Sequence, residues 1–282
     1  MKQPDVWAQF ARTIMTTGKR PHFAPSEEIV VIMRERLAAF VAERGSGCLA
    51  VILGATPELA DIALAAGCRV VRIDSNPAMF EAAAGRQAVA DRTRETILIG
   101  DWLRMEEIRD GEAGIVFGDS SLNNVRHGDM SQQLAELARI TRPGSMLALR
   151  QIMLPEQPQP DYDFAAALAA FRAGRITADD FHRRLRFYAF NAGAYDPVLR
   201  ILDASRVFAE IRRKHEEGSL TEDEFAFLMT RRSEIRHTVY GMAEQQRLFK
   251  SLGTCETIPA GLADSARDLF KIFVIRVGQE RP

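Results

Sequence analysis

Short apolar segments alternate with amphipathic segments between residues 48 and 150. The apolar segments are uninterrupted, which is typical of strands that are covered on both faces of a sheet. They occupy residues 48–53, 69–73, 96–99, 114–117 and 145–149. Segments with helical periodicity lie between them, at residues 57–66, 77–88 and 130–140. Repeated strand–helix units predict an α/β fold with a parallel, doubly wound sheet.

Two further helices are predicted before the first strand, over residues 3–15 and 26–43. The second helix carries Glu27 and Glu28 in its first turn, where carboxylates suit the helix dipole. An irregular polar and aromatic segment, residues 18–25, separates the two helices. We therefore expect residues 1–45 to form an N-terminal helical lid.

A proline-rich break at residues 155–160 separates the α/β region from about 90 residues with helical periodicity. Two helix starts in this block are alike. Thr221 with Glu224 is a full capping box, and Thr177 with Asp180 is close to one. These two starts could mark a duplicated helical hairpin. We favour the independent use of the same capping sequence, because one capping signature is weak evidence for a repeat. We expect residues 154–250 to be a helical insertion that shapes the substrate pocket.

Strand character returns at the end of the chain. Residues 255–260 and 269–277 have strand patterns, with a short helix predicted near 262–268. Residues 46–153 and 251–282 are therefore expected to form one α/β domain, interrupted by the helical block.

The composition is that of a folded globular protein, with 46% hydrophobic and 27% charged residues among 282. The formal net charge of −1 gives no overall field that would attract nucleic acid or an anionic membrane. No apolar run approaches the roughly 20 residues of a membrane helix, and the N-terminus lacks the apolar core of a secretory signal. Three widely spaced cysteines without a CxxC pair predict reduced thiols in a cytoplasmic protein, and no residue cluster has metal-ligand spacing.

The turn after the first strand indicates the kind of ligand. Gly54 permits a tight turn and a close approach of ligand to backbone, and Thr56-Pro57 suits a helix start. A dinucleotide site needs further glycines, which are absent, and Glu58 would place a carboxylate where a phosphate should bind. A phosphate-free ligand with an ammonium and a sulfonium is compatible with this turn.

Asp74 lies twenty residues after Gly54, at the end of the second strand, and is followed by the cap-like sequence Ser75-Asn76-Pro77. An acidic side chain in this position can accept hydrogen bonds from ribose hydroxyls. The alternative is that Asp74 only begins a turn. We favour the ribose role because of its place at a strand end.

Five short motifs, taken together, resemble the class I S-adenosylmethionine (SAM)-dependent methyltransferases. They are Leu-Gly54-Ala-Thr-Pro-Glu-Leu, Asp74-Ser-Asn-Pro-Ala-Met79, Gly100-Asp101-Trp102, Gly118-Asp119-Ser-Ser-Leu-Asn-Asn124 and Arg142-Pro143-Gly144. The resemblance covers residues 48–150 and, less strongly, 254–277. It implies a seven-stranded, mostly parallel sheet whose last strand is antiparallel.

The resemblance also implies roles in holding SAM. The first turn would contact the methionine part of the cofactor, Asp74 the ribose, and Asp101 the adenine amine, with Trp102 beside the base. Where the family has an acidic residue two positions before the first glycine, this chain has Ile52; Glu58 is the candidate substitute. The expected cofactor residues are Gly54, Ala55, Thr56, Glu58, Asp74, Ser75, Met79, Asp101, Trp102, Asp119 and Ser120.

The loop after the fourth strand, residues 118–127, is expected beside the transferable methyl group. It is rich in hydroxyl and amide side chains, some of which would cap the following helix. Asp119 and His127 are candidate catalytic residues, and His22 is a third on the segment before the sheet. The loop lacks the Asp/Asn-Pro-Pro-Tyr/Phe sequence of nucleobase amino-methyltransferases, which argues against DNA or RNA substrates.

Substrate contacts are expected from several parts of the chain. Aromatic residues at 187–190 either face the substrate or, as we favour, pack the block onto the sheet domain. Residues 236–240 are predicted on a helix, and the basic run Arg183, Arg184 and Arg186 is predicted to form a solvated helix face. The expected substrate-binding residues are Arg20, Asn123, Asn124, Tyr188, His237 and Tyr240.

The sequence thus predicts a metal-independent, SAM-dependent methyltransferase of a small molecule or peptide, with no nucleic-acid or membrane partner. Two alternatives remain open: a SAM-using enzyme of intramolecular or lyase chemistry, and a non-catalytic SAM-binding interaction subunit. A nicotinamide dehydrogenase is less favoured because of the missing glycines. The acceptor atom and the oligomeric state, including a homodimer, are also left open.

Overall fold

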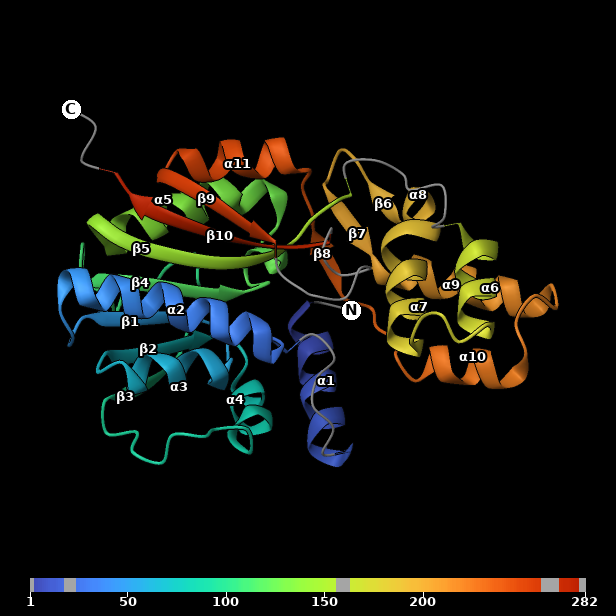
Figure 1. Ribbon diagram of the computed structural model, residues 1–282, viewed down its shortest axis with the longest axis horizontal. Coiled ribbons are helices and arrows are strands. Elements are labelled where there is room, and N and C mark those ends of the chain that lie inside the picture. Colours follow the sequence, from blue (N-terminus) through green and yellow to red (C-terminus); the bar gives the residue numbers. More distant parts are fainter. Residues whose placement is uncertain (1–2, 18–23, 156–162, 260–268, 279–282) are drawn as a thin grey trace.

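The computed structural model describes residues 3–17, 24–155, 163–259 and 269–278. A twisted central sheet with helices on both faces makes up one part of the molecule, and a mostly helical cap lies at one end of that sheet (Figure 1). The expected helix at 262–268 and two of the expected site residues, Arg20 and His22, lie outside the described residues.

The central sheet has seven strands in the order β3-β2-β1-β4-β5-β10-β9. The strands β1, β2, β3, β4 and β5 run parallel, and β10 is antiparallel to both of its neighbours, β5 and β9. Their bounds are β1 Leu49–Leu53, β2 Arg69–Asp74, β3 Glu95–Ile99, β4 Ala113–Asp119, β5 Thr141–Ile152, β9 Gly253–Pro259 and β10 Phe270–Val277. The predicted fold class, including the antiparallel last strand, is confirmed.

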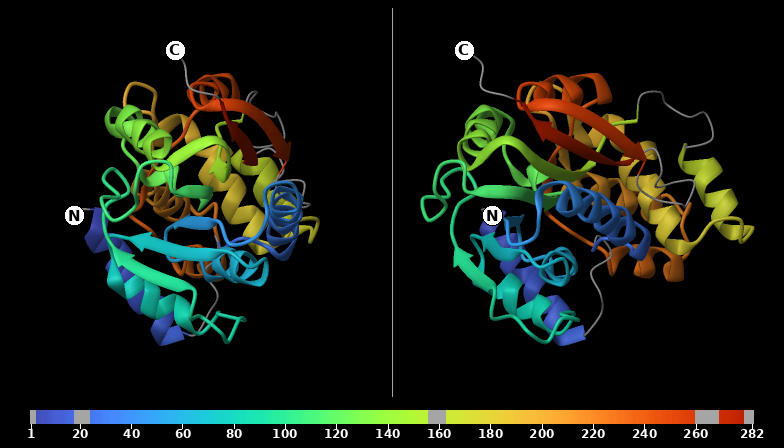
Figure 2. Two further views of the ribbon diagram at one scale, coloured as in Figure 1. Left: turned by 90° about the vertical axis from the view of Figure 1, so that its left-hand side faces the viewer. Right: turned by 60° about the vertical axis from the view of Figure 1, so that its left-hand side comes forward.

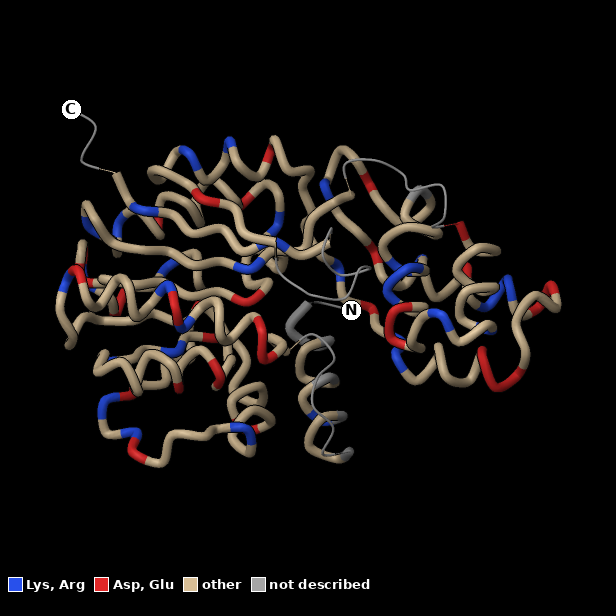
Figure 3. Tube along the Cα trace, viewed as in Figure 1, with Lys and Arg blue, Asp and Glu red and all other residues tan. Residues whose placement is uncertain are grey.

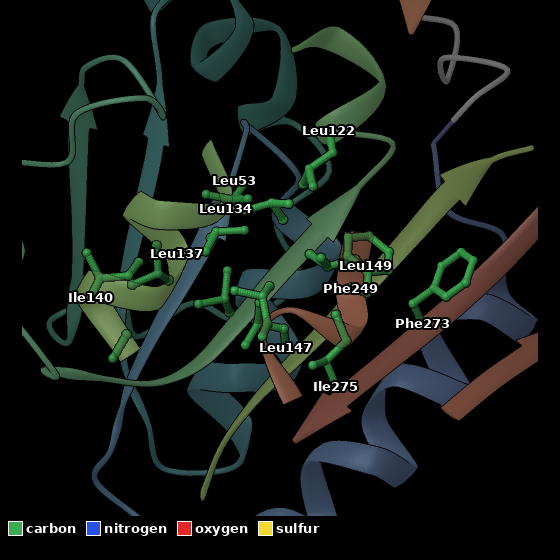
Figure 4. Packing of buried hydrophobic residues seen from close by; sticks show 14 of the residues in the cluster. Leu53, Leu122, Leu134, Leu137, Ile140, Leu147, Leu149, Phe249, Phe273 and Ile275 are labelled. Carbon is green, nitrogen blue, oxygen red and sulfur yellow. The ribbon is translucent and has the colours of Figure 1, made fainter. Parts of the chain in front are cut away.

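Alternate side chains of the buried strands pack on opposite faces, as the two-residue period of a strand requires. On one face Ala50 and Ile52 pack with α2 (Glu27–Arg44) and α3 (Pro57–Ala65). On the other, Val51 and Leu53 pack with α5 (Met130–Ile140) and with Phe249 of α11 (Met242–Lys250). Figure 4 shows this second cluster, with Phe249 and Phe273 in edge-to-face contact.

The first helix, α1 (Gln3–Thr17), packs beside α4 (Pro77–Ala84) through Ala11 and Ile14. Both helices lie near the carboxyl ends of β1 and β2 (Figure 2). Within the described residues, no helix is long and apolar enough to span a bilayer.

The cap has a hydrophobic cluster that includes Phe181, Val207 and Leu228 and extends to Ile152 of β5. Its helices are α6 Phe164–Arg172, α7 Ala178–Arg184, α8 Asn191–Ala194, α9 Ala204–Glu216 and α10 Glu222–Met229, and a π-helical turn, η4, covers Leu185–Ala189. Both predicted helix starts are complete capping boxes, at Thr177 with Asp180 and at Thr221 with Glu224.

Two sequence-based expectations for secondary structure were wrong, one in this block and one in the α/β domain. Residues 236–238 form a strand, β8 (Arg236–Thr238), in a small sheet with β6 (Tyr195–Asp196) and β7 (Ile201–Asp203), and not a helix. Strands of two or three residues are too short to show a periodicity. The helix expected at 77–88 is also shorter, because α4 ends at Ala84.

Candidate active site

A cavity of about 450 Å³ opens where β1, β2, β3 and β4 end and extends to the cap. This volume is typical of small-molecule sites, which span about 300–1,000 Å³. Its position at the carboxyl ends of parallel strands is where open α/β sheets bind ligands. One wall comes from the strand ends, and the opposite wall comes from α7, η4 and β8 of the cap.

Gly54 forms the first part of this wall with a left-handed backbone (φ 112°). Its amide donates a hydrogen bond to the carbonyl of Ile73 at 2.8 Å, which fixes the turn against β2. A Cβ at this position would lie 3.7 Å from the Trp102 ring and 3.8 Å from Asp74 Oδ2. Ala55 and Thr56 also line the cavity. The turn therefore presents bare backbone to a ligand.

Asp74 lies at the end of β2 and also lines the cavity. Its Oδ1 accepts a hydrogen bond from the Asn76 amide at 2.9 Å. Burial raises the pKa of this carboxyl to about 6, while backbone amides of Asn76, Ala55 and Ser75 oppose the shift. Asp74 is thus a desolvated carboxylate at neutral pH, suited to accept hydrogen bonds from a bound ligand.

Asp101 and Trp102 follow β3 and form the next part of the wall. The Trp102 indole Nε1 donates to the Ile73 carbonyl at 2.7 Å, which holds the ring beside Gly54. The Asp101 side chain accepts from the Leu103 amide at 3.0 Å and remains exposed. Ser75 and Met79, from the loop and helix after β2, complete this end of the cavity.

The end of β4 contributes Asp119 to the cavity, and the loop after it contributes Ser120 and Asn124. Asp119 forms a buried ion pair with Arg150 of β5 at 2.6 Å. Ser120 has a left-handed backbone (φ 55°), which is uncommon for a residue with a side chain and recurs at functional sites. The side-chain amide of Asn124 donates a hydrogen bond from Nδ2 to the Ser120 carbonyl at 3.1 Å, which stabilises this backbone conformation.

Asn123, expected to bind substrate, lies behind the cavity wall instead. It is 2% exposed, and its amide nitrogen donates to the carbonyls of Ile152 and Thr238, at 3.1 and 2.7 Å. Its oxygen accepts from the Ile152 amide at 2.9 Å. Asn123 therefore joins the loop after β4 to β5 and to the cap strand β8.

Four other expected site residues do not line the cavity. His127 is exposed, and its Nδ1 is hydrogen-bonded to the buried Tyr240 hydroxyl at 2.9 Å. Glu58 accepts a hydrogen bond from Arg86 Nε at 3.2 Å. Tyr188 packs against the cap cluster. The contacts of these four side chains, which include Tyr240, are with other parts of the protein, so they favour a structural role.

The cap wall includes His237, as expected, and Arg186, which sequence reasoning placed elsewhere. The solvated helix face predicted for Arg183, Arg184 and Arg186 is wrong for Arg186, which is only 3% exposed. The physical reason is the π-helical turn η4, because its extra residue per turn rotates Arg186 inward. No periodicity in the sequence indicates such a turn. Trp7, Gln133 and His182 are lining residues that the sequence analysis also missed.

Residues 53–149 match the model of the methyltransferase domain family. These residues run from the end of β1 to β5 and carry the strand-end side chains described above. The chain contains a class I SAM-dependent methyltransferase domain. A search of curated protein sequences finds no match.

Solved structures similar to this methyltransferase share its fold at low sequence identity. An N-methyltransferase, NodS from Bradyrhizobium japonicum WM9, in complex with S-adenosylhomocysteine (SAH), superposes with a TM-score of 0.54 at 10% identity, covering 98% of this chain and 99% of its own. The 1,6-didemethyltoxoflavin-N1-methyltransferase of Burkholderia thailandensis, with its substrate and SAH bound, gives 0.53 at 11% identity, covering 99% and 92%.

A candidate Zn-dependent alcohol dehydrogenase from Rhodobacter sphaeroides gives a TM-score of 0.58 at 16% identity, covering 98% of this chain and 100% of its own. At this identity the likeness shows the fold alone. In the described part of this methyltransferase, no group of three or more His, Cys, Asp or Glu residues could hold a metal ion.

Proposed function

We propose that this methyltransferase transfers the methyl group of SAM to a small molecule or peptide held between the sheet and the cap. The observation that carries the proposal is one continuous cavity, lined at one end by Asp74 and Asp101 and at the other by Phe187 and His237. A cavity closed around the cofactor alone would favour intramolecular or lyase chemistry. The cap residues instead offer surface for a second molecule.

The strand-end residues fit SAM chemically. Asp74, a desolvated carboxylate, would accept hydrogen bonds from the ribose hydroxyls. The bare backbone of Gly54, with Ala55 and Thr56, would contact the methionine portion, and Asp101 with Trp102 the adenine. Ser75 and Met79 lie beside these groups. No phosphate enters this assignment, which agrees with the single glycine of the turn.

SAM supplies an electrophilic methyl on a sulfonium, which an acceptor attacks in line. The protein's task is then to hold the acceptor in an attack geometry, about 3–3.5 Å from the methyl carbon. Asp119 and Ser120, at the end of β4, are the residues proposed for this positioning, with Asn124 beside them. Since Arg150 neutralises Asp119, we propose that Asp119 orients the acceptor and does not act as a free base.

Charge placement supports a small acceptor over nucleic acid. Basic and acidic positions are interspersed along the described residues of both the sheet part and the cap (Figure 3). Nucleic-acid binding proteins instead gather Lys and Arg on one face. The free cysteines Cys48, Cys68 and Cys255 agree with the cytoplasmic location expected from the sequence.

Calorimetric titration with SAM and SAH tests the proposal. We expect wild type to bind both, and Asp74→Ala to bind at least about tenfold more weakly, because hydrogen bonds to charged groups contribute about 1.5–3 kcal/mol. Asp223→Asn, an exposed acid on α10 away from the cavity, is the matched control and should bind as wild type. Absence of binding heat for SAH with wild type would refute the proposal.

A further inference from the structure

Arg186 is a buried cation in the cap wall of the cavity. Within the described residues, its Nε and Nη2 are buried and have no hydrogen-bond partner. The guanidinium lies over the Phe187 ring, 5.4 Å from the centroid, which is a weak substitute for an ion pair. Burial lowers its pKa to about 10, so the side chain remains charged at neutral pH.

The described neighbours of Arg186 do not neutralise its charge. His237 is buried nearby, and burial together with the Arg186 charge lowers the pKa of its imidazole to about 3, so it is neutral. Asp179, on the same wall, is already paired with Arg231. Arg183 on the preceding helix has its own partner, Asp180, at 2.5 Å.

A buried, unpaired charge is costly, and proteins retain one where a ligand completes the pair. Among the residues that the structure describes, the wall around Arg186 has one unneutralised positive charge, which matches a monoanion. A guanidinium binds a carboxylate with two parallel hydrogen bonds. Phe187 and Phe270, whose rings meet edge to face at 6.5 Å, add an apolar aromatic surface beside it.

We propose that Arg186 binds a carboxylate of the methyl acceptor, so that the substrate of this enzyme is a carboxylic acid with an apolar or aromatic body. This inference rests on the proposed function, because it assigns the substrate class of the same cavity. Arg186 sets the substrate's orientation from the cap side, while the strand ends hold the cofactor. A phosphate dianion would bring one negative charge more than this wall can balance.

The test uses benzoate, benzamide and phenyl phosphate, each titrated into the full-length protein saturated with SAH. We expect benzoate to bind at least about tenfold more tightly than its neutral analogue benzamide, because only benzoate can form charge-assisted hydrogen bonds with the Arg186 guanidinium. Arg186→Met should lose this preference, and Arg186→Lys should retain part of it, since the charge remains but the planar fork is gone. Arg212→Met, an exposed arginine on α9, is the matched control and should behave as wild type.

A second readout separates substrate recognition from a structural role. Without ligand, Arg186→Met should melt about 2 °C or more above wild type, because it removes an unpaired buried charge at nearly constant volume. A lower melting temperature, an equal affinity for benzoate and benzamide, or a preference for phenyl phosphate over benzoate would each overturn the inference. SAH binding is measured in the same samples, so loss of SAH binding by wild type would refute the proposed function separately.

Discussion

At the scale of single residues, the side chains proposed to hold the cofactor could be predicted because each follows a strand. Gly54 and Asp74 come directly after apolar segments and Asp101 one residue later, and the ends of parallel strands meet at one edge of a sheet. Asn123 and Arg186 could not be predicted in this way. The surroundings of Asn123 depend on the cap strand β8, and those of Arg186 depend on the turn η4 and the cavity wall, which form only in the folded chain.

The burial of Asp74 predicts how ligand binding depends on pH. Ribose hydroxyls favour the charged carboxylate, so SAH affinity should be constant above about pH 7 and weaken as pH falls through about 6. The limit is about tenfold per pH unit for one proton. Calorimetry from pH 5 to 8 measures this, and the slope should vanish in Asp74→Asn. A pH-independent affinity in wild type would contradict the assignment of Asp74.

The same shift has the opposite sign for folding without ligand. Because the pKa of Asp74 is raised from 3.8 to about 6, its contribution to stability is present at low pH and is lost as pH rises through about 6. Asp74→Asn should therefore melt above wild type at pH 7.5 and not at pH 4, while binding SAH more weakly. Thermal unfolding at the two pH values checks this trade-off between stability and binding.

At the scale of elements, the loop after β4 links the two parts of the molecule. Asn123 makes three buried hydrogen bonds, to β5 and to β8, and these fix the loop that carries Asp119 and Ser120. The seven strands of the main sheet could be predicted because their segments of four or more apolar or alternating residues show a strand pattern. The strands β6, β7 and β8 and the turn η4 are too short or too irregular for that.

Replacing Asn123 tests this link. Asn123→Ala should lower the free energy of unfolding by about 2–4 kcal/mol, because it leaves buried backbone groups of Ile152 and Thr238 without a partner. Asn124→Ala, which loses one hydrogen bond of a half-buried side chain, should cost less than about 1.5 kcal/mol. Denaturant titration compares the two variants. Equal losses would show that Asn123 is not the link we describe.

At the scale of the whole molecule, the sheet and the cap have different proposed roles, one in binding the cofactor and the other in binding the substrate. The sheet carries the proposed cofactor site at its strand ends, and the cap lines the cavity with apolar rings and the buried cation Arg186. The fold and the cofactor could be predicted from local motifs in residues 48–150. The substrate side could not, because it brings the adjoining elements α7 and η4 together with β8, which lies far from them in sequence.

A crystal structure of this enzyme with SAH tests the central claim most directly. We predict that SAH lies in the cavity at the ends of β1, β2 and β3, with its ribose hydroxyls within hydrogen-bond distance of Asp74. We also predict that its sulfur faces the loop of Asp119 and Ser120. SAH bound elsewhere, or with its ribose away from Asp74, would contradict the account.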